Sequence, residues 1–258
     1  MGAKLDVESP EARVEKLKRT REMLGKRRDA FAKTKTYADA LEVIRNKLAN
    51  IDIVSVRCLA LGSPSNEFNA LYQLAFLVLI LDELKIRQVS VYDPAFNDID
   101  VLLFEELGFK IEDKITQKVS KEEDILYYMP HAPVELLEEI ITSEKIVVMI
   151  TNDLRRYIGR WTSQDLYEKH PNVARIGYLT SQIRSEQPST DDGFEMVASK
   201  KKVRKNRRNK LKVVDTNVDY HLDECYFDSC DIAEILGGSD ISGEWKDSFS
   251  CLAVHVIR

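Results

Sequence analysis

The sequence predicts an α/β protein with a three-layer, Rossmann-like and mostly parallel sheet that follows N-terminal helices. Short apolar segments alternate with helical segments between residues 54 and 152. Strands that are separated by single helices usually pair in parallel. Each apolar segment also ends in small or polar residues, which is typical of strands that lead into a ligand-binding edge. A charged, helix-forming stretch precedes the first of these segments.

Two helices are predicted before the first strand. Ser9 and Pro10 suit the cap and first turn of a charged helix that continues to about Lys33. Apolar side chains then recur between residues 37 and 48 with the i, i+3, i+4, i+7 spacing of an amphipathic helix. We therefore assign residues 1–50 to N-terminal helices that pack on the core, and residues 51–258 to the Rossmann-like domain.

Strands and crossover helices alternate through the middle of the chain. The predicted strands are residues 54–61, 89–92, 110–111, 125–129 and 146–150, and the predicted helices are residues 69–85, 99–107 and 134–142. The helix at 69–85 is apolar on nearly all sides, which indicates that it is buried.

The pattern weakens after residue 152. Residues 161–167 favour a helix, and residues 173–179 favour an extended segment. The polar and charged stretch at about 184–218 is predicted to be a disordered insertion. Residues 231–236 favour a short helix, and residues 249–257 are apolar on both alternating faces, as in a buried final strand.

Composition excludes several classes of protein. The longest apolar run is much shorter than the roughly 20 residues that cross a bilayer, and the N-terminus lacks the apolar segment of a secretory signal. The four cysteines are too few and too scattered for a disulfide scaffold. We expect a soluble protein of a reducing compartment, without a membrane partner.

One segment departs from the acidic balance of the chain. Residues 200–212, KKKVRKNRRNKLK, contain no acidic residue, whereas the net charge of the whole chain is −5. Such a run is typical of a nuclear-import signal, a phosphate-binding tail or a solvated loop. Because it contains no aromatic residue, base stacking is disfavoured, and nucleic acid is expected only at this run. The import candidates are Lys200, Lys201, Lys202, Arg204, Lys205, Arg207 and Arg208.

The candidate ligand site consists of the residues that follow the strands. These residues are Gly62, Ser63, Asp93, His131 and Asn152. Parallel strands bring their carboxyl ends to one edge, where open sheets bind ligands. A glycine turn before a helix permits close approach of a ligand, and an acid after the second strand can bind ribose hydroxyls. The alternatives are a plain tight turn at Gly62, a turn cap at Asp93 and a helix cap at His131.

No complete catalytic motif accompanies these residues. Gly62 lacks the further glycines of the dinucleotide fingerprint, and no phosphate-loop lysine follows it. Cys251 and His255 lie four residues apart on a predicted strand, too far to chelate one ion, so we expect no metal site. His131 has no nucleophile motif beside it. A non-enzymatic role is therefore favoured over catalysis.

These motifs together resemble the sensitivity-to-red-light-reduced family, called the benomyl-resistance family in fungi. The similar segments are Leu59–Ser63, Tyr72–Ala75, Tyr92–Pro94, Tyr128–Ala132 and Thr151–Asp153, with a closing segment from Trp245 to His255. The family pattern has glycine at position 60, cysteine at position 132, and glycine and serine on either side of Asn152.

The resemblance implies a regulatory protein of cytoplasm and nucleus, and we expect it to have a protein partner. Members are linked to circadian rhythm and light signalling in plants, to haem-biosynthesis regulation and clock-gene expression in animals, and to microtubule-related phenotypes in fungi. The first hypothesis is therefore a regulator whose cleft senses a ligand or docks a partner. The second is a methyltransferase-like enzyme that binds adenosylmethionine or another nucleotide-like cofactor. The third is an RNA-associated factor that uses residues 200–212.

Overall fold

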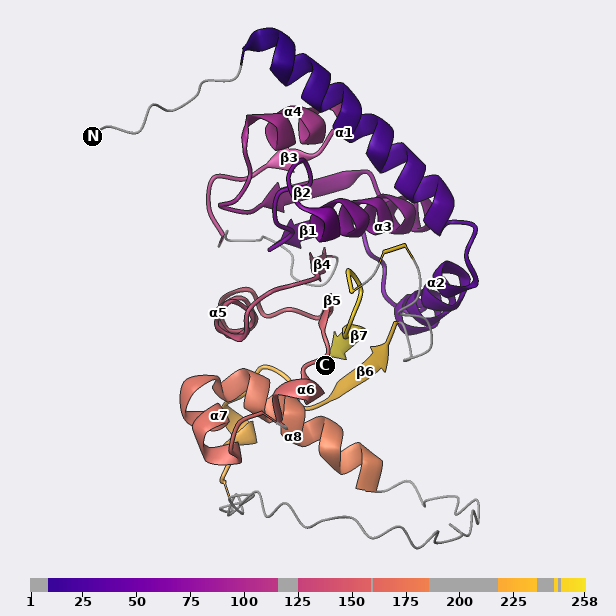
Figure 1. The fold of residues 1–258 in the computed structure, drawn as a ribbon. Coiled ribbons are helices and arrows are strands. Elements are labelled where there is room, and N and C mark those ends of the chain that lie inside the picture. The colour runs from indigo at the N-terminus through magenta and orange to yellow at the C-terminus, as the bar shows by residue number, and fades with distance from the viewer. Residues whose placement is uncertain (1–8, 116–124, 159, 186–217, 236–243, 246) are drawn as a thin grey trace, which may run out of the picture.

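One seven-stranded sheet organises the protein. The computed structural model describes residues 9–115, 125–158, 160–185, 218–235, 244–245 and 247–258 (Figure 1). The strand order is β3-β2-β1-β4-β5-β7-β6. β1 to β5 are parallel, and β7 runs antiparallel to its neighbours β5 and β6. The strands are β1 (Ser55–Leu59), β2 (Gln88–Tyr92), β3 (Lys110–Ile111), β4 (Ile125–Met129), β5 (Val148–Asn152), β6 (Cys230–Glu234) and β7 (Leu252–Ile257).

Helices cover both faces of this sheet and make three layers, as predicted. One face carries α1 (Pro10–Phe31), α2 (Lys35–Leu48), α3 (Phe68–Leu84) and α4 (Asp98–Glu106). The other face carries α5 (Val134–Glu144), α6 (Arg155–Ile158), α7 (Ser163–Lys169) and α8 (Pro171–Ser185), and a short 3-10 helix spans Leu222–Glu224. None of these helices is long and apolar enough to cross a membrane.

Successive side chains of the central strands point alternately into two separate cores, one on each face of the sheet. Val56 and Cys58 of β1 belong to the core under α3, whereas Leu59 belongs to the core under α5. β4 repeats the pattern, with Tyr128 on the first face and Tyr127 on the second. Because successive side chains of a strand point to opposite faces, strands covered on both faces are apolar throughout.

The N-terminal helices α1 and α2 pack on the first face of the sheet. The Ser9 hydroxyl caps α1 by accepting a hydrogen bond from the Ala12 amide at 3.2 Å. At the other end of α1, Phe31 is buried and its ring centroid lies 5.6 Å from Phe76 and 4.9 Å from Phe249. This aromatic cluster joins α1 to the buried helix α3 and to the segment that precedes the last strand.

Two predicted elements are wrong. Residues 173–179 are part of α8, because their apolar side chains recur at helical spacing and pack under α5. Residues 230–234 form strand β6 instead of beginning a helix, because they pair with β7 over Cys230–Glu234. The predicted insertion begins within α8, and residues 186–217, which include the basic run at 200–212, lie outside the described residues. The domain boundary near residue 50 stays a prediction.

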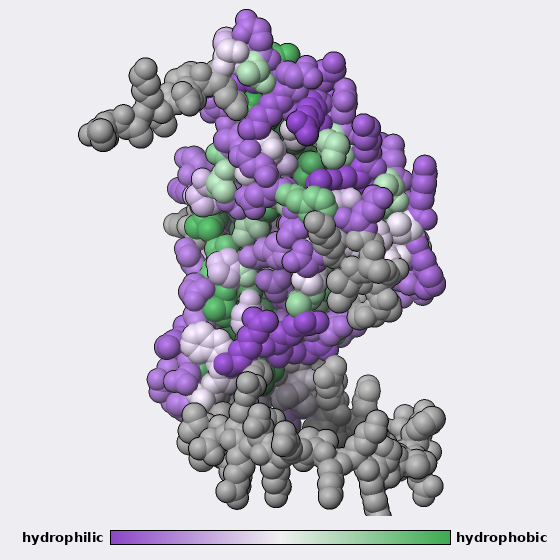
Figure 2. All heavy atoms as spheres, viewed as in Figure 1, coloured by the Kyte–Doolittle hydropathy of each residue, from purple (hydrophilic) through white to green (hydrophobic). Residues whose placement is uncertain are grey.

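The surface in Figure 2 is mostly hydrophilic. Charged and polar residues cover most of the face in view, and apolar residues gather toward its middle, between α4 and α5.

Truncation of the aromatic cluster is expected to cost a large part of the stability. Phe31→Ala should lower the free energy of unfolding by about 3–5 kcal/mol, since the buried ring leaves a cavity. Val14→Ala on the same helix is the control, because Val14 is 67% exposed and its truncation should cost less than about 0.5 kcal/mol. Urea denaturation of both variants measures the two values. Equal, small losses would contradict the packing of α1 on the core.

Candidate functional site

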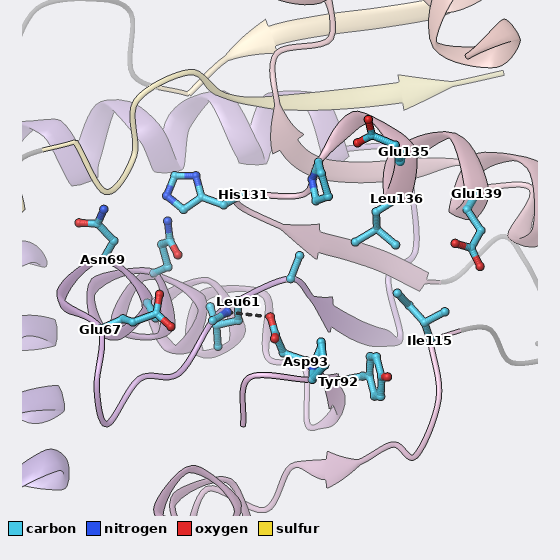
Figure 3. Close-up of a pocket in the computed structure, with 16 residues that line it drawn as sticks. Leu61, Glu67, Asn69, Tyr92, Asp93, Ile115, His131, Glu135, Leu136 and Glu139 are labelled. Carbon is cyan, nitrogen blue, oxygen red and sulfur yellow. Dashed lines mark hydrogen bonds between the residues drawn. The ribbon is translucent and has the colours of Figure 1, made fainter. Parts of the chain in front are cut away.

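A cavity of about 640 Å³ lies at the carboxyl ends of β1, β2 and β4 (Figure 3). From β1 the sheet continues to β2 and β3 in one direction and to β4 and β5 in the other. Such a reversal of strand order opens a crevice where doubly wound sheets bind ligands. Figure 3 shows Glu67 and Asn69 at one end of the cavity, Ile115 and Glu139 at the other, and Asp93 between them.

Three of the five candidate residues line this cavity. They are Gly62, Asp93 and His131. Ser63 is buried beside it, and its hydroxyl donates to the Asp100 carboxylate at 2.6 Å. Asn152 also lies outside the lining, and its amide donates to the Ala132 carbonyl at 3.3 Å. Ser63 and Asn152 therefore support the walls of the cavity, and ligand contact by any of the five residues stays a prediction.

Three carboxylates hold the turn between β1 and α3. Asp93 accepts from the Gly62 amide at 2.8 Å, and Glu67 accepts from the Ser63 amide at 3.0 Å. Asp100 accepts from the Ser65 amide at 2.8 Å. Each carboxylate satisfies a backbone donor that helix ends and turns otherwise leave unpaired. The strand ends are thereby joined to the starts of α3 and α4.

Asp93 serves as a turn cap as well as a cavity residue. Its second oxygen accepts from the Ala95 amide at 2.8 Å, so the side chain bridges the ends of β1 and β2. A carboxylate has about four acceptor positions, and two of them are used here. Asp93 can therefore accept further hydrogen bonds from a ligand without leaving the turn.

The backbone of this turn takes a left-handed conformation at two positions. Gly62 has φ +78°, a conformation that favours glycine, and a Cβ there would lie 2.9 Å from a Glu67 carboxylate oxygen and displace it. Ala60 has φ +52° although it carries a Cβ. That conformation costs a residue other than glycine roughly 1–2 kcal/mol. Ala60 also lines the cavity, where its methyl group takes space that a glycine would leave.

Gln73 is a buried polar residue of the cavity wall that the sequence reasoning missed. It is fully buried in α3, and its side-chain amide donates to the Ser248 carbonyl at 2.8 Å. Its Oε1 has no hydrogen-bond partner among the described residues. The sequence alone could have identified Gln73 as a candidate, because it interrupts an otherwise apolar stretch of the buried helix.

Other acidic residues of the site were also missed. Glu67, Glu135 and Glu139 line the cavity. Asp100 lies behind it, where Asn97 and Asp100 form the capping box of α4. The Asn-x-x-Asp spacing is a known helix-start pattern and could have identified Asp100. No local pattern distinguishes the three glutamates from ordinary exposed residues.

The His131 ring lies at the rim of the cavity. The surrounding protein lowers the pKa of His131 by removing solvent, while the negative charges of Asp247 and Glu67 oppose this effect. The imidazole is therefore neutral at pH 7, and one ring nitrogen can accept a hydrogen bond while the other donates.

A buried ion-pair cluster supports the far wall. Arg57 of β1 donates to the Glu112 carboxylate at 2.7 Å and to the Ile115 carbonyl at 2.6 Å, and it lies 3.2 Å from Glu144 of α5. Burial disfavours the guanidinium charge, but the hydrogen bond to Glu112 and the two carboxylate charges outweigh it and raise the pKa of Arg57. The cluster fixes Ile115, which lines the cavity.

The described residues offer little for metal or thiol chemistry. No group of three or more described histidine, cysteine or acidic side chains could hold a metal ion. Burial raises the pKa of the Cys58 thiol, and it raises the pKa of Cys230 to about 12. Both thiols are therefore protonated and buried, which is the state of structural cysteines.

Comparison with known proteins matches most of this structure. The family model described as the SRR1 domain covers residues 40–256, which include all five candidate residues. The chain belongs to the SRR1 domain family. The resemblance seen in the sequence motifs is thus confirmed. An SRR1-like protein of Drosophila melanogaster is 31% identical over 109 residues. That match covers 40% of this chain and 39% of the relative, so this chain aligns with only about two fifths of the relative's length.

Restoring glycine at position 60 is expected to stabilise this SRR1-domain protein. Ala60→Gly should raise the free energy of unfolding by about 1 kcal/mol, because glycine adopts the left-handed conformation without strain. Ala70→Gly is the control, since Ala70 also lines the cavity but lies in α3, where glycine costs about 1 kcal/mol. Urea denaturation should give opposite signs for the two variants. A loss at both positions would contradict strain at Ala60.

Proposed function

We propose that this SRR1-domain protein is a regulatory protein whose cleft binds a small, nucleoside-like ligand without rapid turnover. The observation that carries the proposal is the cavity at the reversal of strand order, with the Gly62 turn and Asp93 at neighbouring strand ends. Asp93 retains free acceptor positions for ribose hydroxyls. The cavity volume is within the range of ordinary small-molecule sites.

The composition of the cavity wall favours binding over covalent catalysis. The described residues that line it include no serine, threonine, cysteine or lysine. Nucleophilic catalysis by a hydroxyl, thiol or amine of these residue types requires such a group within hydrogen-bond distance of a base. His131 is available as a base, but it has no such partner in the described lining.

The regulatory part of the proposal rests on the family. The sequence motifs resemble proteins that are linked to circadian rhythm, clock-gene expression and haem-biosynthesis regulation. We extend these links to this chain as roles in cytoplasm and nucleus, exerted through a protein partner. The ligand would then report a metabolic state to that partner.

A methyltransferase is the second candidate function. Its support is the Rossmann-like sheet with the glycine turn at Gly62 and with Asp93 after the second strand. A fold alone does not determine a function, so this likeness carries less weight than the cavity. Transfer of labelled methyl groups from adenosylmethionine to a cellular acceptor by the purified protein would favour this candidate over the regulator.

Filling the cavity is expected to remove ligand binding. Leu136→Trp on α5 places an indole in the lining, so the affinity for adenosylmethionine should fall at least about tenfold in calorimetry. Leu102→Trp is the matched control, because Leu102 is 40% exposed on α4 and outside the lining. Native mass spectrometry of the purified chain should also detect a co-purifying small molecule that Leu136→Trp loses. Equal binding by both variants would place the ligand elsewhere.

The basic run is proposed to direct nuclear import. Deletion of residues 200–212 should lower the nuclear fraction of a fluorescent fusion without changing the melting temperature, since the run has little apolar surface to bury. Replacement of the same residues by a glycine–serine linker of equal length controls for spacing. An unchanged distribution would remove the import role, and loss of RNA binding on deletion would favour an RNA-associated factor instead.

A further inference from the structure

The turn that could hold a phosphate is already occupied by carboxylates. Phosphate-binding turns present free backbone amides at the start of a helix. In this protein the amides of Gly62, Ser63 and Ser65 donate to the protein's own side chains, Asp93, Glu67 and Asp100. A phosphate would have to displace acceptors that carry the same sign of charge. At these three amides the turn therefore repels the group that a glycine turn usually attracts, although the first turn of α3 itself carries no side-chain cap.

The charge of the cavity wall also disfavours a phosphate group. Four carboxylates, those of Glu67, Asp93, Glu135 and Glu139, belong to residues that line it, and the described lining contains no lysine or arginine. His131 is the remaining titratable basic group there, and its lowered pKa leaves it neutral. Like charges gathered around one cavity favour an occupant of opposite charge.

Gln73 gives an independent indication of a hydrogen-bond donor. Its Oε1 is buried and without a partner among the described residues, and the residue lines the cavity. The Nε2 group of the same amide donates a hydrogen bond to the Ser248 carbonyl at 2.8 Å, so Oε1 is the atom that lacks a partner. A buried acceptor left unpaired is unfavourable, and a ligand donor that entered this part of the wall would satisfy it.

The rest of the wall is apolar and suits the body of an organic molecule. Leu61, Ala70, Ile115 and Leu136 contribute aliphatic surface, and Tyr92 contributes a ring. We infer that the cavity selects an organic cation with hydrogen-bond donors and an apolar body, and excludes ligands that carry phosphate. This inference deepens the proposed function and rests on it.

Three probes that share adenosine test the charge preference. Adenosylmethionine carries a positive sulfonium, adenosylhomocysteine differs from it by one methyl group and lacks that charge, and ATP adds phosphates. Calorimetry on the full chain should give adenosylmethionine an affinity at least about tenfold above that of adenosylhomocysteine. ATP should not bind at millimolar concentration. Added salt should reduce the difference between the first two probes, because salt screens the carboxylates.

A charge-matched pair of double variants identifies the source of the preference. Glu135→Gln with Glu139→Gln removes two exposed acidic charges from the cavity wall. Glu15→Gln with Glu22→Gln removes the same charge from exposed positions on α1, outside the lining. The first pair should reduce the preference for adenosylmethionine severalfold, and the second should leave it unchanged. Thermal melting verifies that both variants remain folded.

The outcomes separate this inference from the function on which it rests. Equal or tighter binding of adenosylhomocysteine or ATP, abolished by Leu136→Trp, would overturn the charge preference and leave the ligand-binding cleft intact. A preference that both double variants reduce equally would overturn its assignment to the cavity carboxylates. Absence of binding by all three probes at millimolar concentration would count against the proposed function and the inference together.

Discussion

The turn after β1 is the constraint on which the site depends. The backbone amides of the turn that leads from β1 into α3 need acceptors, and here Asp93, Glu67 and Asp100 provide them from three different segments. These hydrogen bonds join the end of β1 to the end of β2 and to the starts of α3 and α4. Glycine is favoured at position 62 because the backbone there is left-handed, and a side chain would also displace the Glu67 carboxylate. The same interactions that shape the cavity also give its wall a negative charge.

The opposite wall depends on a charge buried in the central strand. Arg57 binds Glu112 and Glu144, so the guanidinium connects β1 with the segment after β3 and with α5. Removing one partner of a buried ion pair is strongly destabilising, because it leaves the other charge without compensation. The hydrogen bond from Arg57 to the Ile115 carbonyl extends this order to the cavity. Both walls are therefore held by ionised groups, while the apolar cores on the two faces of the sheet hold the layers together.

This arrangement explains how a Rossmann-like sheet can depart from nucleotide chemistry. Such sheets commonly bind phosphate through the free amides of a glycine turn. In this SRR1-domain protein the amides of Gly62, Ser63 and Ser65 are paired with the protein's own carboxylates, and the cavity wall contains four acidic residues. The location of the site is shared with nucleotide-binding folds, whereas its charge is not. The proposed regulatory role, which depends on a small organic cation, fits a wall that is rich in hydrogen-bond acceptors.

The sequence by itself determined the α/β class, the parallel strands, the burial of α3 and the cap at Ser9, because these depend on the spacing of neighbouring residues. It also indicated that Gly62, Asp93 and His131 belong to one edge of the sheet. Only the tertiary structure decided that residues 230–234 form a strand, since that strand exists through pairing with β7. Likewise, the glutamates of the cavity acquire their role from segments far apart in the chain. Local patterns encode local structure, whereas a shared cavity and its charge depend on which segments meet in the folded protein.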